Sequence, residues 1–251
     1  MRLENRVEAQ SRPPSITGAA SAVHKWLALL LMLPILFWFA SGLFFALSPI
    51  EQVRSEHLMA QAPVRQVALS KAAAGLKRLA EQGVDTADRV ELRTLLGTPV
   101  ALINRGKDRP VLYDLGSGKR LSPLPAATAM AIARRDYNGT ATIARVVAVT
   151  QASTEYRGAL PAWEVRLAGD AGLSIYVAAD TGIVTARRSQ LWRVYDFLWG
   201  LHILDPGEHQ NFNTLLLVLA VGSSMILLIS GIVLIPERLG WLARWKRARR
   251  R

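Results

Sequence analysis

Residues Trp26–Leu47 read WLALLLMLPILFWFASGLFFAL, and residues Phe212–Ile235 read FNTLLLVLAVGSSMILLISGIVLI. Both stretches lack charged side chains. They run for about 22 and about 24 residues, and a helix needs only about 20 apolar residues to cross the hydrocarbon core of a bilayer. Buried helices of soluble proteins are usually shorter and carry polar positions. The two stretches therefore predict transmembrane helices over residues 23–47 and 212–235.

A cleaved signal peptide is the alternative interpretation of the first stretch. Its apolar length exceeds the roughly 7–15 residues of a signal-peptide core. The small-residue triplet Ala46-Leu47-Ser48 is followed by Pro49, which is a poor context for cleavage. We therefore predict an uncleaved signal anchor.

Basic residues near the two stretches predict the topology. The formal net charge is +12, from 31 Lys and Arg against 19 Asp and Glu. Before the first stretch, Glu4 and Glu8 are outnumbered by Arg2, Arg6, Arg12 and Lys25. After the second, Glu237 alone opposes Arg238, Arg244, Lys246, Arg247, Arg249, Arg250 and Arg251. Since basic flanks stay in the cytoplasm, both termini are expected there, with residues of roughly 48–211 in the periplasm of a bacterial inner membrane.

The basic C-terminal tail could also be read as a nucleic-acid patch. A basic run that directly adjoins a membrane span is more often a topology determinant and a contact for lipid headgroups. We expect the bilayer, and no nucleic acid, as its partner.

The segment between the spans shows a repeated order of one helix followed by strands. The first copy, residues 64–122, predicts a helix over Ala68–Val84 and strands at 89–95, 99–104 and 110–115. The second copy, residues 123–188, predicts a helix over Pro125–Tyr137 and strands at 142–150, 162–167, 173–178 and 183–186. An internal repeat with a period of about 62–64 residues accounts for this order. Each helix is expected on one face of a small antiparallel sheet, which makes the fold class membrane-anchored α+β.

The remaining segments connect this region to the membrane. Residues 191–211 predict an interfacial helix and a linker, and residues 1–22 and 236–251 are expected as cytoplasmic tails. The chain contains no cysteine, which excludes disulfides, zinc–thiolate sites and cysteine nucleophiles. It also lacks the common hydrolase, zinc-protease and nucleotide-binding motifs.

Two of the four histidines lie on apolar helix faces. His24 shares a face with Leu31, Ile35 and Trp38, and His202 shares one with Leu191, Tyr195 and Leu198. A neutral imidazole on such a face must find a hydrogen-bond partner. Packing between helices is one interpretation of both residues, and ligation is the other.

Four potential metal ligands occur close together near the second span. They are His202, Asp205, Glu208 and His209. Imidazole and carboxylate groups at this density could bind a divalent metal. The spacing matches no closed zinc motif, and Pro206-Gly207 predicts an ordinary turn in the same place.

The chain resembles a known family. Pro161–Leu167 (PAWEVRL) and Leu173–Arg188 (LSIYVAADTGIVTARR) resemble the strand and hairpin of the PepSY domain. His24-Lys25-Trp26-Leu27 and Leu198–His202 (LWGLH) resemble the flanks of PepSY-associated transmembrane proteins. The resemblance covers nearly all of residues 20–237 and implies a tandem PepSY-like periplasmic domain between two spans.

The resemblance implies two functions of different kinds. PepSY units are similar to the propeptides of thermolysin-type proteases, which act as inhibitors and folding aids. This similarity implies a non-catalytic module that binds a protein or peptide by strand addition. Some larger relatives are regarded as membrane reductases for iron–siderophore complexes. Membership of that group would imply haem b on His24 and His202, a role in iron uptake and an oxidoreductase activity. The two histidines lie about 30 Å apart across the core, so only copies in a homodimer could pair them on one iron. The binding module is our prediction, and the haem-binding redox component is its alternative. Another membrane or periplasmic protein, or a homo-oligomer, is the expected partner.

Overall fold

The computed structural model describes residues 16–60, 66–169 and 172–248. Several residues used for the topology prediction lie outside these ranges, namely Arg2, Glu4, Arg6, Glu8, Arg12 and Arg249–Arg251. The chain divides into two compact units. One comprises the described residues up to Phe44, together with Gly200–Pro206 and those from Gln210 onward; the other comprises Phe45–Trp199 and Gly207–His209.

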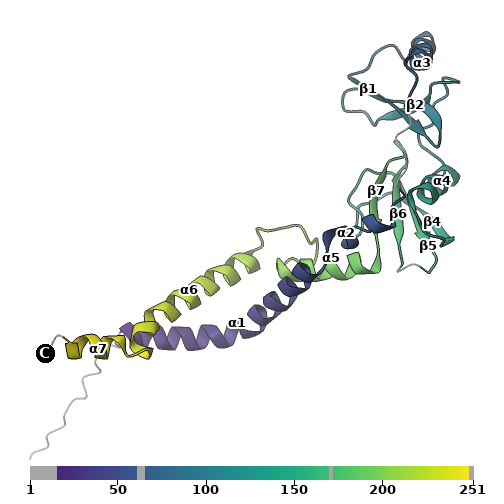
Figure 1. The fold of residues 1–251 in the computed structure, drawn as a ribbon. Helices are drawn as coiled ribbons and strands as arrows, with labels where there is room; N and C mark the ends of the chain where they lie inside the picture. The colour runs from purple at the N-terminus through teal and green to yellow at the C-terminus, as the bar shows by residue number, and fades with distance from the viewer. Residues whose placement is uncertain (1–15, 61–65, 170–171, 249–251) are drawn as a thin grey trace, which may run out of the picture. The chain divides into compact units, whose positions relative to one another are not determined.

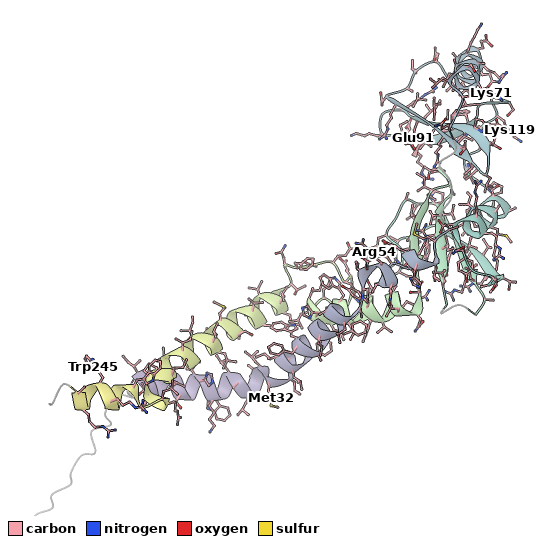
Figure 2. All side chains as sticks on the ribbon, viewed as in Figure 1. Met32, Arg54, Lys71, Glu91, Lys119 and Trp245 are labelled. Atoms are coloured by element: carbon pink, nitrogen blue, oxygen red, sulfur yellow. The ribbon has the colours of Figure 1, made fainter. Side chains whose placement is uncertain are left out.

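Two long apolar helices make up most of the first unit (Figure 1). These are α1 (Ile16–Leu47) and α6 (Leu215–Arg238). Each is long and apolar enough to cross a membrane. In the most apolar 18-residue stretch of each helix, only 11% of α1 and 6% of α6 is buried. The core helix of a soluble protein would be mostly covered, whereas side chains such as Met32 point outward from α1 (Figure 2). The apolar surfaces of α1 and α6 are thus of the kind that contacts the hydrocarbon core of a bilayer.

The ends of these helices follow local chemistry. α1 is already helical at Ile16, upstream of the predicted residue 23. α6 begins at Leu215 and not at residue 212, because the Thr214 hydroxyl accepts a hydrogen bond from the Leu217 N–H at 3.1 Å and caps the helix. A short helix, α7 (Trp241–Ala248), follows α6 after Gly240, whose φ is +65°.

The second unit opens with short helical turns and then holds two antiparallel sheets. Before the first sheet lie α2 (Ile50–Val53), the 3-10 turn η1 (Glu56–Leu58) and α3 (Leu69–Glu81). The first sheet has the order β1 (Arg89–Leu95), β2 (Thr98–Asn104) and β3 (Val111–Asp114). Leu96 and Gly97 join β1 to β2 with both φ angles positive, as a type I′ hairpin turn requires.

The second sheet follows one further helix. α4 (Ala126–Asp136) precedes β4 (Ile143–Val149), β5 (Ala162–Leu167), β6 (Ser174–Ala178) and β7 (Val184–Arg188), which are hydrogen-bonded in that order. β4 and β7 are therefore its edge strands. α5 (Gln190–His202) comes directly after β7, and its last residues belong to the first unit.

Each sheet packs against the helix that precedes it. Ala72 and Leu79 of α3 pack on Ala101 and Ile103 of β2, and Gly75 allows α3 to approach the Leu115 backbone closely. α4 packs on the second sheet through Ala129, Ile132 and Ala133, which meet Val165, Ile175 and Val177. The helix-on-antiparallel-sheet arrangement agrees with the fold expected from the sequence.

The two sheets share one core, which the sequence did not predict. Val100 and Leu102 alternate with Ala101 and Ile103 along β2, and they join the cluster built on α4 rather than the one built on α3. The first sheet is consequently buried on both faces at its central strand. This explains the unbroken apolar run of β2, since only strands covered on both sides lose the alternation of apolar and polar residues.

Candidate functional site

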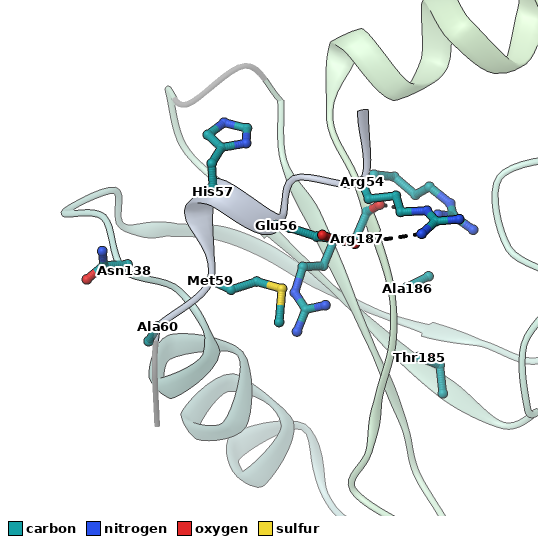
Figure 3. Close-up of a pocket in the computed structure, with 10 residues that line it drawn as sticks. Arg54, Glu56, His57, Met59, Ala60, Asn138, Thr185, Ala186 and Arg187 are labelled. Carbon is teal, nitrogen blue, oxygen red and sulfur yellow. Dashed lines mark hydrogen bonds and ion pairs between the residues drawn. The ribbon is translucent and has the colours of Figure 1, made fainter. Parts of the chain in front are cut away.

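A large groove runs along β7, an edge strand of the second sheet (Figure 3). It has a volume of about 1200 Å³. One wall is β7, from Thr185 to Arg188, and the other is the segment from Arg54 to Ala60, with Asn138 at one end. An edge strand directs alternate N–H and C=O groups away from its sheet, where a further strand can pair with them. The groove thus places an extended, hydrogen-bonding edge beside an open volume.

The wall opposite β7 is held in place by backbone hydrogen bonds. The Ala60 N–H donates to the Asp136 carbonyl at 2.7 Å, and the Asn138 N–H donates to the Leu58 carbonyl at 2.9 Å. A β-bridge joins Met59 to Tyr137 between these two bonds. Residues 58–60 therefore form a short strand-like contact with the end of α4, which fixes the width of the groove.

The groove carries an excess of positive charge. Among the described residues that line it, Arg54, Arg187 and Arg188 are cations and Glu56 is a carboxylate, while Asp136, outside the lining, pairs with Arg187. Glu56 lies 3.8 Å from the Arg54 guanidinium, whose side chain is 64% exposed. Such a loose, exposed pair is worth little, so Arg54 remains available to an anionic group.

The other two arginines are tied to the fold. Arg187 forms a two-pronged ion pair with Asp136 at the end of α4. Arg188 donates to the Glu155 carbonyl at 2.9 Å, and its guanidinium lies 4.0 Å from the Trp192 ring centroid. Burial lowers the pKa of Arg188, but an arginine begins so far above neutral pH that the group stays charged. Both cations are thus held at fixed positions along β7.

A buried polar cluster supports the sheet face behind β7. The Tyr156 and Tyr176 rings stack with centroids 4.6 Å apart, and Glu155 pairs with Arg193 of α5. Burial raises the pKa of Tyr176, and the nearby Glu155 and Glu164 carboxylates raise it further. Burial raises the pKa of Tyr156 as well. These groups fix α5 against the second sheet.

The two histidines expected to bind haem lie at contacts between helices. The Nδ1 atom of His24 lies 3.1 Å from the Leu227 carbonyl oxygen and 3.0 Å from the Ser230 hydroxyl of α6. The Nδ1 atom of His202 lies 2.8 Å from the Ser41 hydroxyl of α1, and the Trp38 indole donates to the His202 carbonyl at 2.8 Å. Among helices that expose apolar surface, such polar contacts hold the helices together.

The profile of one protein family, described as PepSY-associated TM region, matches residues 21–251. The chain belongs to this PepSY-associated TM family. The match includes α6 and α1 from residue 21 onward, so the family and the structure agree on a membrane protein with two candidate spans. No curated protein and no solved structure matches the chain.

Within this PepSY-associated TM protein, the two histidines do not fit a single haem. Ser41, which binds His202, follows His24 by about 17 residues on one helix, which is about 25 Å at about 1.5 Å per residue. Axial ligands of one iron must lie on its two sides only a few ångströms apart. One chain therefore cannot supply both ligands, as the sequence had indicated, and ligation between two chains stays a prediction.

Among the expected metal ligands near residue 205, the side chains of His202, Asp205 and His209 have hydrogen-bond partners in the protein. One Asp205 oxygen accepts hydrogen bonds from the Gln210 and Asn211 N–H groups, both at 2.8 Å. His209 Nδ1 lies 2.6 Å from the Asp196 carboxylate, and the Glu208 carbonyl accepts from Arg157. Within the described ranges, no group of three or more His, Cys, Asp or Glu residues is arranged to hold a metal ion. A metal on His202, Asp205, Glu208 and His209 stays an untested prediction.

Sequence reasoning missed the groove along β7. The sequence placed a strand at residues 183–186 but gave no order of strands within the sheet, so its free edge was not recognised. The segment from Arg54 to Ala60 was assigned no structure. The adjacent Arg187 and Arg188, directly after the strand predicted at residues 183–186, were the one sequence signal for a charged groove here.

Proposed function

We propose that this PepSY-associated TM protein is a membrane-anchored binding module that holds an extended acidic peptide segment along β7. The carrying observation is the positively charged groove at the edge of the second sheet. In this proposal the protein is non-catalytic, its tandem PepSY-like domain lies on the periplasmic side of a bacterial inner membrane, and both termini are cytoplasmic. The occupant is a segment of another membrane or periplasmic protein.

Strand addition suits this groove for a physical reason. An incoming strand gains main-chain hydrogen bonds from an edge that is already ordered, and side-chain contacts then decide which sequence is accepted. Three arginines and one glutamate line the groove, so acidic side chains on the incoming strand would be favoured. The rigid bridge between Met59 and Tyr137 limits the loss of freedom when the segment binds.

Peptide binding to the full chain in lipid nanodiscs tests the proposal. A fluorescent octapeptide that alternates Glu with Val should bind, measured by anisotropy, about tenfold more tightly than the matching Lys–Val peptide, because charge complementarity separates them. The same Glu–Val peptide with a central proline should lose binding, since proline removes a ladder hydrogen bond.

A pair of charge reversals locates the site. Arg54→Glu should abolish the preference for the acidic peptide, whereas Lys77→Glu on α3 should leave it intact, because Lys77 is an exposed cation away from the groove. Equal binding of the acidic and basic peptides to the unmodified chain would refute the proposal. So would an equal response to the two reversals.

A haem-binding redox component is a second candidate, and the His24 geometry favours it. An imidazole whose Nδ1 is held by a carbonyl and a hydroxyl is oriented as metal-binding histidines usually are. In a homodimer, His24 and its copy could then bind haem. The visible spectrum of the purified protein decides: a Soret band that disappears in His24→Ala supports this candidate, and a preparation that stays colourless after incubation with haem removes it.

A further inference from the structure

A second hollow lies between α1 and α6 within the first unit. Its volume is about 630 Å³, within the range of about 300–1,000 Å³ typical of small-molecule sites. α1 contributes Ser21, His24 and Lys25, and α6 contributes Gly231, Leu234, Ile235 and Arg238, followed by Leu239. The lining thus combines apolar side chains with two cations, Lys25 and Arg238.

The arrangement of α1 and α6 opens this hollow. His24 bridges to Leu227 and Ser230, and a side-chain carbon at Gly231 would lie 3.1 Å from the His24 ring. The ring therefore fills the space next to Gly231 and stops the helices from closing together beyond it. The turns that follow on α6 are left lining an open space with Leu234 and Ile235.

Lys25 and Arg238 are the two cations of this hollow. Within the residues that the structure describes, neither Lys25 nor Arg238 takes part in an ion pair. The Lys25 ammonium lies 5.3 Å from the Trp26 ring centroid. Glu237 lines a neighbouring hollow together with Arg238, so an anion would be drawn to the Lys25 side, away from that carboxylate.

The depth of the hollow in a bilayer follows from the helix that comes next. Trp241 and Trp245 of α7 are 55% and 54% exposed, and Figure 2 shows the Trp245 side chain extending from this helix. Tryptophan concentrates where lipid headgroups meet the hydrocarbon. Arg238 comes only three residues before Trp241, so the cations lie at headgroup level while Leu234 and Ile235 face the acyl chains.

We propose that the hollow between α1 and α6 binds an anionic phospholipid, with its phosphate at Lys25 and Arg238 and an acyl chain along Leu234 and Ile235. Basic pockets between membrane helices are suited to such headgroups. The site is independent of the peptide groove, because it uses other residues in the other unit. Bound lipid would also fill the space between the two helices.

Lipid selectivity of the full chain tests this proposal. The protein is reconstituted in vesicles of phosphatidylcholine containing a trace of spin-labelled phosphatidylglycerol or of spin-labelled phosphatidylcholine. The fraction of motionally restricted label gives the relative association constant of each lipid. We expect phosphatidylglycerol to be preferred, and we expect Lys25→Gln with Arg238→Gln to lower that preference about tenfold, since each cation close to an anionic lipid contributes about fivefold and exposure reduces this.

A matched double variant separates a site from general attraction. Arg244→Gln with Arg247→Gln removes the same charge from α7, outside the hollow, and should leave most of the preference. Equal losses in the two double variants would overturn the proposal, as would equal association of the two lipids with the unmodified chain. Displacement of the lipid by millimolar inorganic phosphate would show a free-phosphate site and also overturn it.

Discussion

Gly75→Ala tests whether α3 rests on the first sheet as described. A methyl group at Gly75 would lie 2.6 Å from the Leu115 carbonyl oxygen and 2.7 Å from its Cβ and Cδ2 atoms. Because one of these atoms is backbone, the helix or the strand end must shift, and overpacking of this kind costs about 1–3 kcal/mol. Alanine also gains about 1 kcal/mol over glycine in a helix. We expect the clash to prevail, with a net loss of about 1–2 kcal/mol.

Hydrogen exchange measured by mass spectrometry reads this loss locally. Amides of β2, which α3 covers at Ala101 and Ile103, should exchange about 5–30-fold faster in Gly75→Ala. Ala74→Gly is the matched control: residue 74 is exposed, so its change reports helix propensity alone, at about 1 kcal/mol. If Gly75→Ala slowed exchange in β2, the gain in helix propensity would exceed the cost of the clash with Leu115. The close approach of α3 to Leu115 would then be refuted.

Three further predictions test other parts of the structure. The pKa of Tyr176 is raised in the folded protein, so its contribution to stability is complete below about pH 10 and is lost as the pH rises further, because the unfolded chain ionises first. Between pH 9 and pH 11, this residue should lower the free energy of unfolding, measured in urea, by about 1 kcal/mol. Tyr176→Phe should reduce that difference. An unchanged pH dependence in Tyr176→Phe would contradict the assignment. Asp136→Ala leaves Arg187, whose side chain is 17% exposed, without its carboxylate, and should lower the free energy of unfolding by about 2 kcal/mol; a change below about 0.5 kcal/mol would show that the pair contributes nothing. Since the chain has no cysteine, Lys77→Cys and Arg244→Cys each provide a single label site; an impermeant maleimide should modify residue 77 in spheroplasts but residue 244 only after lysis, and the reverse pattern would overturn the predicted topology.

The helices and most strands were predictable because their signals are local. Alternation and turn residues placed β1 and β5 at the bounds that the structure has, and Gly83, with φ of +82°, marks the end of the predicted first helix. β3 is shorter than predicted, Val111–Asp114 against 110–115. Strand edges depend on pairing across the sheet, which a single segment does not encode.

For the candidate sites as well, the sequence revealed single residues, and the fold supplied their partners. His24 and His202 stood out in the sequence because a histidine on an apolar face needs a partner, but the partners, Ser230 and Ser41, lie on helices far away in the chain. The groove could not be recognised in this way, since Arg54 and Arg187 are separated in sequence by the first sheet and by three strands of the second. Only folding brings such residues to opposite walls of one groove.

The sequence by itself determined the two membrane helices, the order of most helices and strands between them, and the family to which the chain belongs. Hydrophobic length and periodicity act over a few turns or strands, so the order of residues is enough to reveal them. The tertiary structure alone decided that the two sheets share a core, that β7 is an edge strand, and that a hollow lined by Lys25 and Arg238 opens between α1 and α6. These features arise from contacts between distant segments, and their energies depend on distances that no local pattern contains.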